Sequence, residues 1–264
     1  MTYDRPPVYV PATPKFILEV IRDSHRQQCQ FDPEADPSAE FSFETTTGDW
    51  RSACDLVDAK GLGRALNQEF GLNFPDDVWH GVLEPPWERE LRGVCELIAS
   101  QAERPTIKPV TILGSTCLPA GAFLAIRFLL KEAGADVSTV APSTPLADYT
   151  RSFLGVFLGP VSRLAPNALP DVRVWTPWYD LSIIGFSFGL LLFGGSAMLT
   201  ALWAMAGWAM AGGAILAVSS WAGTWIAGRY LPPASVEFGT LRTFRDMAKC
   251  VAEGVQPTSG ILPH

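Results

Sequence analysis

The chain has 264 residues, with 20 Lys and Arg against 27 Asp and Glu, and a net charge of −7 at pH 7. Residues 1–180 carry 16 basic against 24 acidic residues, a net charge of −8. This acidity argues against nucleic acid as a partner, because phosphate binding needs a basic face. Three dispersed histidines and five cysteines without a close pair argue against a zinc site. The sequence therefore predicts no metal and no cofactor.

The first predicted helix follows a proline-containing stretch, residues 1–13, which we expect to be a flexible arm. Thr13 followed by Pro14 predicts a helix start, because the hydroxyl caps free amides and proline fits the first helical position. The helix is predicted to end near Gln28.

An acidic helical domain is predicted over residues 14–102. From residue 49 to residue 101, apolar residues recur at helical spacing in several short segments, and Gly71 is expected to close one of them in the left-handed conformation. A last helix is expected over residues 87–102. The pattern is typical of a small bundle of short helices.

Part of this domain resembles acyl carrier proteins. The resemblance covers roughly residues 50–102 and is carried by Leu66-Asn-Gln-Glu-Phe-Gly-Leu-Asn-Phe-Pro-Asp-Asp and Leu91-Arg-Gly-Val-Cys-Glu-Leu-Ile. It implies a carrier-like helical fold. Carriers attach phosphopantetheine to a serine in an Asp-Ser-Leu triplet, and the matching triplet here is Asp55-Leu56-Val57. Because leucine cannot carry the arm, the resemblance implies a copy that has lost carrier chemistry.

A second stretch resembles the carrier loop that leads to the attachment serine. It reads Pro142-Ser-Thr-Pro-Leu and gives Ser152 the position of that serine. Arg151 replaces the expected Asp and Phe153 replaces the Leu. Ser152 is therefore the one candidate attachment residue, and it departs from the family pattern on both sides.

Residues 103–180 are predicted to hold a linker, a helix over residues 119–133 and a membrane-proximal segment. Ser115 or Thr116 is expected to cap that helix. Cys117 lies at the helix start, where the helix dipole lowers a thiol pKa.

A nucleophilic cysteine also needs a base. The candidate bases, His25 and His80, are far from Cys117 in sequence. We interpret His25 as solvated and His80 as partly buried, and we name no catalytic residue.

The longest apolar stretch is residues 181–228, 48 residues without one Asp, Glu, Lys, Arg or His. A bilayer core about 30 Å thick needs roughly 20 apolar helical residues, so the run predicts two spans, at about 181–202 and 208–228. Small residues, including the pair Gly185 and Gly189, favour close packing within this hairpin or a homo-oligomer formed through it. The predicted fold class is therefore mainly α, with a cytoplasmic helical domain and a two-helix transmembrane hairpin.

Lys and Arg lie on both flanks of the hairpin and are missing from its tip, which predicts an integral protein of the inner membrane with both termini in the cytoplasm. No cleavable signal peptide is expected at the N-terminus. Residues 229–264 are predicted to form a short amphipathic helix, capped by Thr240 or Thr243, and a tail. Anionic lipid and the cytoplasmic domain are both open as the surface this helix contacts.

These observations favour a membrane-anchored adaptor or assembly component, with the lipid bilayer and a protein as partners. The alternative is an accessory protein or enzyme of membrane lipid or acyl-group metabolism. A channel formed by the hairpin is disfavoured, because the apolar run holds no ionisable residue.

Overall fold

We analysed a computed structural model of the chain, which describes residues 6–56, 58–112, 114–175, 187, 215, 218–219 and 234–255. The chain divides into two compact units. The first comprises residues 1–173 and 237–264, and the second comprises residues 174–236. The two helical layers, the cleft and the cavity all belong to the first unit.

Helix α1 (Pro14–Gln28) confirms the first predicted helix at both ends. The Thr13 hydroxyl accepts a hydrogen bond from the Phe16 amide at 3.2 Å, as expected of the cap. The buried face of α1 holds Phe16, Ile17, Leu18, Val20 and Ile21. Local signals were sufficient here, because the cap and the apolar spacing agree with each other.

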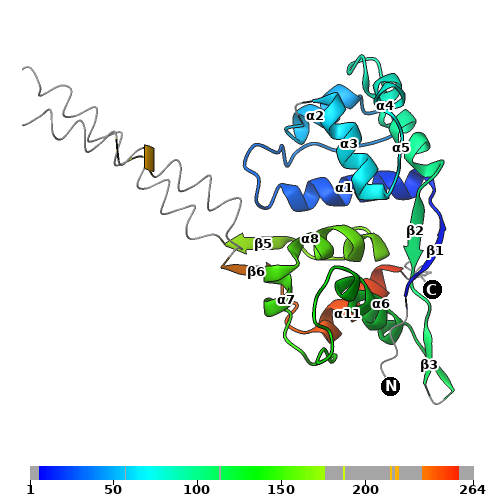
Figure 1. Cartoon of the computed structure of the whole chain (residues 1–264), viewed down its shortest axis with the longest axis vertical. Helices are drawn as coiled ribbons and strands as arrows, with labels where there is room; N and C mark the ends of the chain where they lie inside the picture. The colour runs from blue at the N-terminus through cyan, green and yellow to red at the C-terminus, as the bar shows by residue number, and fades with distance from the viewer. Residues whose placement is uncertain are drawn as a thin grey trace, which may run out of the picture. The chain divides into compact units, whose positions relative to one another are not determined.

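Four shorter helices pack with α1 into an N-terminal layer: α2 (Thr47–Ala53), α3 (Ala59–Phe70), α4 (Asp76–Leu83) and α5 (Leu91–Ala99). Figure 1 shows them gathered on one side of this unit. Their shared core includes Trp50, Leu66, Trp79, Leu83, Leu91, Val94 and Ile98. Gly71 has a φ of 66° and confirms the predicted left-handed cap of α3.

Helix α5 starts at Leu91, not at the predicted residue 87. Long-range hydrogen bonds hold the preceding loop in another conformation: the Thr47 amide donates to the Arg89 carbonyl at 2.7 Å, and the Leu91 amide donates to the Thr45 carbonyl at 2.9 Å. Helix α5 therefore begins only where the segment that is hydrogen-bonded to Thr45 and Thr47 ends.

Strand β1 (Val8–Pro11), in the segment predicted to be an arm, pairs antiparallel with β2 (Glu103–Thr106). Strands β3 (Val110–Ile112) and β4 (Ser115–Cys117) form a second antiparallel pair. Ser115 and Thr116 therefore belong to a strand, so the prediction that one of them caps the next helix is wrong. Strand β5 (Val172–Trp175) pairs with β6 (Ser235–Phe238).

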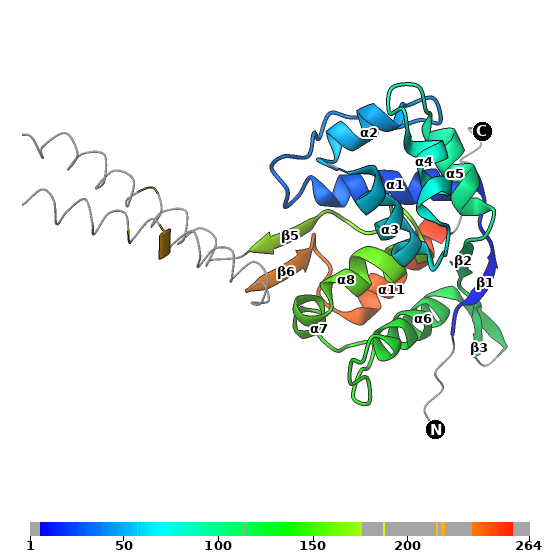
Figure 2. The ribbon, with the colours of Figure 1, turned by 45° about the horizontal axis from the view of Figure 1, so that its top comes forward.

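A second layer, on the other side of the unit from α1 to α5, is built around α6 (Leu118–Glu132) and α11 (Phe244–Val255). Helix α7 (Ala147–Ser152), the short α8 (Leu154–Val156), the π-helix η1 (Phe157–Val161) and the 3₁₀ turn η2 (Ser162–Leu164) complete it (Figure 2). Helix α11 is the predicted amphipathic helix. Its apolar face, with Phe244, Met247 and Val251 buried, packs on α6, so docking onto the protein is the alternative that the structure supports.

The segment predicted to lie on a membrane surface is instead part of this layer. Phe157 and Val161 are fully buried, and the Phe157 ring lies 6.0 Å from the Phe238 ring. The apolar residues that suggested a membrane surface therefore cover the protein's own core.

The predicted fold class is wrong in two respects. The structure is about half helical and has small antiparallel strand pairs, so it is not mainly α. Among the described residues, no helix combines the length and apolarity needed to cross a bilayer. The longest of these, α1 and α6, have 15 residues each, about 22 Å against a core of about 30 Å, and both carry charged side chains.

The transmembrane hairpin was predicted over residues 181–228, almost all of which lie outside the described residues. The glycines through which a homo-oligomer was predicted also lie outside the described residues. No helix of the described residues supports the hairpin, or the inner-membrane localisation and the orientation of the termini that depend on it. We do not retain these predictions.

Candidate functional site

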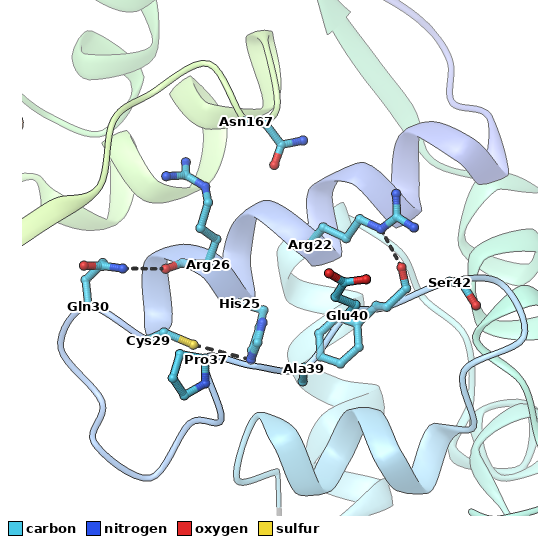
Figure 3. Close-up of a pocket in the computed structure, with 11 residues that line it drawn as sticks. Arg22, His25, Arg26, Cys29, Gln30, Pro37, Ala39, Glu40, Ser42 and Asn167 are labelled. Carbon is cyan, nitrogen blue, oxygen red and sulfur yellow. Dashed lines mark hydrogen bonds between the residues drawn. The ribbon is translucent and has the colours of Figure 1, made fainter.

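An open cleft of about 760 Å³ lies between α1 and the segment that follows it. Figure 3 shows the side chains around it. One wall is the C-terminal half of α1, the other is the loop over residues 37–42, and Asn167 reaches in from the second layer. The residues that line it are Arg22, His25, Arg26, Cys29, Gln30, Pro37, Ala39, Glu40, Phe41, Ser42 and Asn167.

His25 and Cys29 lie one helical turn apart and contact each other in this cleft. The Cys29 sulfur is 3.4 Å from Nε2 of His25 (Figure 3), and the imidazole packs on Phe41 with ring centres 4.7 Å apart. His25 is only 6% exposed, so its interpretation as a solvated residue is wrong. His80 is exposed on α4, so its interpretation as partly buried is also wrong.

The thiol of Cys29 is not activated. Burial raises its pKa above the ordinary value, and the nearby carboxylates of Asp36 and Asp32 add to that rise. Within the described residues, His25 makes no side-chain hydrogen bond besides the one to Cys29. A neutral thiol beside an imidazole without an orienting carboxylate lacks the features of a cysteine nucleophile.

Arg26 holds the base of the cleft together and is already neutralised. One terminal nitrogen donates to the Asp23 carboxylate at 2.6 Å and to the Leu169 carbonyl at 2.7 Å. The other pairs with the carboxylate of Asp171. Arg26 therefore joins α1 to the segment before β5 and has little remaining charge for a ligand.

Several groups that line the cleft have hydrogen-bonding capacity that no described residue uses, among them Arg22, Glu40 and Asn167. Nε of Arg22 donates to the Phe41 carbonyl at 2.6 Å, which orients the guanidinium (Figure 3). Its terminal nitrogens have no partner among the described residues, and the same holds for the Asn167 amide. Asn167 has a φ of 66°, a left-handed conformation that asparagine tolerates.

A second, smaller cavity of about 200 Å³ lies among α1, α2 and α3. Its walls are mostly apolar: Val20, Ile21, Trp50, Cys54, Leu56, Leu62, Ala65, Leu66 and Phe70, with Ser24, His25, Gln28 and Glu69 as the polar members. Burial raises the pKa of the Cys54 thiol to about 12, in keeping with this environment.

The structure does not bring the residues singled out from the sequence together. Cys117 is the residue before α6, and no described contact joins it to His25 or His80. Ser152 ends α7 and is exposed. Among the described residues, no group of three or more His, Cys, Asp and Glu side chains is placed to hold a metal ion.

Sequence reasoning missed the contact between His25 and Cys29. Its signal was available, since His25 lies in the last turn of a helix whose limits were predicted correctly and Cys29, four residues on, is its C-cap. The approach of Asn167 had no such signal, because it depends on packing between segments far apart in the chain.

Comparison with protein-family models, with curated proteins and with solved structures finds no match to this chain.

Proposed function

We propose that the first unit is a protein-interaction module of an adaptor or assembly component, and that a segment of the partner binds in the cleft beside α1. The observation that carries the proposal is the unused hydrogen-bonding capacity of Arg22 on α1 and of Asn167 from the second layer, which both line this open cleft. A guanidinium that is already oriented and an amide are suited to bind peptide carbonyls or a carboxylate. The raised pKa of the Cys29 thiol supports a binding role over a catalytic one.

A photo-crosslinking amino acid at position 37 tests this proposal. Pro37 is exposed on the cleft wall, whereas Gly81 on α4 lies outside it and leaves open space for a side chain. In the native cells we expect a discrete protein adduct from position 37 that is lost when Arg22→Ala is added, and no such adduct from position 81. Identical adducts from both positions, or none from position 37, would overturn the proposal.

The second candidate function is an accessory protein of lipid or acyl-group metabolism, and the apolar cavity among α1, α2 and α3 favours it. A cavity of about 200 Å³ with apolar walls suits an aliphatic chain. Decanoate should then displace a fluorescent naphthalene sulfonate dye from the protein. Ala65→Phe, which fills the cavity, should abolish the displacement. Gln68→Phe, on the same helix outside this cavity, should not.

If the protein is itself a carrier, a group attached to Ser152 should add mass to the intact protein, and this mass increment should disappear in Ser152→Ala. An unmodified chain removes the carrier version and leaves the ligand-binding version to the dye experiment.

A further inference from the structure

The loop between α4 and α5 displays a tryptophan on the surface. Trp87 is 62% exposed, more than any other large apolar side chain of the first unit that the structure describes. Large aromatic side chains are normally covered, and an exposed tryptophan on a fixed backbone is a typical anchor of protein interfaces.

The Trp87 ring rests on the backbone of α2. A Cβ at Gly48 would lie 2.4 Å from Cε3 of the Trp87 ring, so only a glycine lets the ring sit this close. The ring therefore has one side on the backbone at Gly48. Its high exposure leaves the other side to solvent.

The loop that carries the ring is fixed by hydrogen bonds to the start of α2. The Thr47 hydroxyl donates to the carbonyls of Leu83 and Pro86, at 3.0 Å each. The Gly48 amide donates to the Pro86 carbonyl at 2.7 Å. Because Thr47 is fully buried, these bonds are shielded from water. The exposed ring is thus held in one orientation before any partner arrives, which lowers the entropic cost of binding.

Each member of this contact has an acidic residue as its neighbour in sequence. Residues 44–51 and 84–92 hold five acidic and three basic residues, a net charge of −2. Glu84 pairs with Arg51 at 2.8 Å, and Arg92 pairs with Glu44 and Glu90. The two acidic residues left without an ion pair among the described residues are Asp49 and Glu88. One oxygen of the Asp49 carboxylate accepts a hydrogen bond from the Thr46 hydroxyl at 2.7 Å.

These two acidic residues are the direct neighbours of Gly48 and Trp87 in sequence, and both are exposed. Arg89 is the one cation of this region without a carboxylate partner among the described residues, and its Nε is engaged by the Glu84 carbonyl at 2.9 Å.

We propose that Trp87, together with Asp49 and Glu88, is a docking site for a lysine or arginine side chain in a basic segment of a partner protein. The negative π face of tryptophan attracts a cation more strongly than any other side-chain ring does, and nearby carboxylates add to that attraction. The net charge of −7 favours the approach of a basic partner. This site shares no residue with the cleft beside α1 and does not depend on the function proposed for it.

The test uses an acetylated hexa-arginine peptide as the probe and hexa-citrulline, which has the same shape without the charge, as its control. Affinities are measured by calorimetry at low ionic strength. Trp87→Ala leaves the net charge unchanged, so it separates the ring from general electrostatic attraction. We expect this change to weaken hexa-arginine binding roughly 2- to 5-fold, and Trp87→Phe to weaken it less.

Two further variants test whether a loss of affinity comes from the Trp87 ring in its position on α2 and not from a general loss of structure. Gly48→Ala keeps the tryptophan but pushes its ring off the backbone, and we expect it to weaken binding in the same direction as Trp87→Ala. Trp175→Ala removes another exposed tryptophan, 57% exposed, and should leave the affinity unchanged.

Equal affinity of wild type and Trp87→Ala, or equal binding of hexa-citrulline, would overturn this proposal. The adduct at position 37 of the cleft would be unaffected by either result, so the two proposals fail separately.

Discussion

Ser162 donates a hydrogen bond to the carboxylate of Asp23, across 139 residues of chain. Asp23 is 1% exposed, and its other oxygen accepts from Arg26 at 2.6 Å. Since Asp23 lies on α1 and Ser162 on η2, this carboxylate connects the N-terminal layer to the second layer. It also supports Arg26 at the base of the candidate cleft.

Replacing this carboxylate should destabilise the protein strongly. Asp23→Asn leaves the Arg26 guanidinium without its buried counter-charge, and we expect the free energy of unfolding to fall by about 2 to 4 kcal/mol. Asp171→Asn, which removes the more exposed partner of Arg26, should cost less than about 1 kcal/mol. Urea denaturation of both variants checks the difference. Equal losses of stability in the two variants would show that the buried ion pair stabilises the protein no more than the exposed one does.

Replacing either of two helical glycines by alanine should change the free energy of unfolding, in opposite directions for the two positions. A Cβ at Gly63 on α3 would lie 2.6 Å from the ring of Trp79, which is 1% exposed and cannot move aside. Gly63→Ala should therefore lower the free energy of unfolding by about 1 to 3 kcal/mol. Gly81→Ala on α4 meets nothing within 4 Å and should raise stability by about 0.5 to 1 kcal/mol. Thermal denaturation of the two variants measures both changes. A loss of stability in both would contradict the packing argument.

The sequence predicted correctly the elements that local chemistry determines. The limits of α1 follow from its cap and its apolar spacing, and the end of α3 follows from Gly71. In each case the signal lies within a few residues of the feature.

Long-range contacts account for what the sequence did not predict. The pairing of Val8 with Thr106 joins two short segments that carry no mutual signal. The late start of α5 depends on two hydrogen bonds, from the Leu91 amide to the Thr45 carbonyl and from the Thr47 amide to the Arg89 carbonyl. The apolar residues around Phe157 could equally face a membrane or a protein core, because composition alone does not tell these surroundings apart. The same holds for the candidate cleft, where the position of Asn167 depends on tertiary packing.

The buried thiols should be inert in the native protein. Burial raises the pKa of Cys54 and of Cys95 from 9.0 to about 12, so both stay protonated at pH 8. We expect a maleimide to label neither of them in native protein at pH 8 and to label both after unfolding in guanidinium chloride, as read by mass spectrometry of the peptides. Labelling of Cys54 in the native state would contradict its burial.

The same pKa values predict a loss of stability at high pH. Below pH 9 these thiols are neutral in both states and give no pH dependence. Above pH 9 the unfolded chain ionises them while the native protein does not, so the free energy of unfolding falls as the pH rises toward 12. Replacing both cysteines by alanine should flatten this part of the curve in urea denaturation.

The hydrogen bonds at the start of α11 predict a loss of stability at low pH. The Thr243 hydroxyl and amide and the Arg242 amide all donate to the Asp246 carboxylate, at 2.9, 2.9 and 3.2 Å. The Asp246 amide donates back to the Thr243 hydroxyl at 3.3 Å, which makes a reciprocal cap. These hydrogen bonds, the one from the Thr243 hydroxyl foremost, lower the pKa of Asp246 below its ordinary value of 3.8.

A lowered pKa in the native state means that the contribution of Asp246 to stability is present above pH 4 and is lost as the pH falls through the native pKa. Asp246→Asn should therefore be less stable than wild type at pH 7, and the difference should shrink as the pH falls below 4. Thr243→Ala should cost about 1 kcal/mol at pH 7 and make stability depend less on pH, because it removes the main donor to the carboxylate. Urea denaturation at pH 7, 5 and 3 measures both effects. A difference for Asp246→Asn that stays constant from pH 7 to pH 3 would show that the ionised carboxylate does not stabilise the cap of α11.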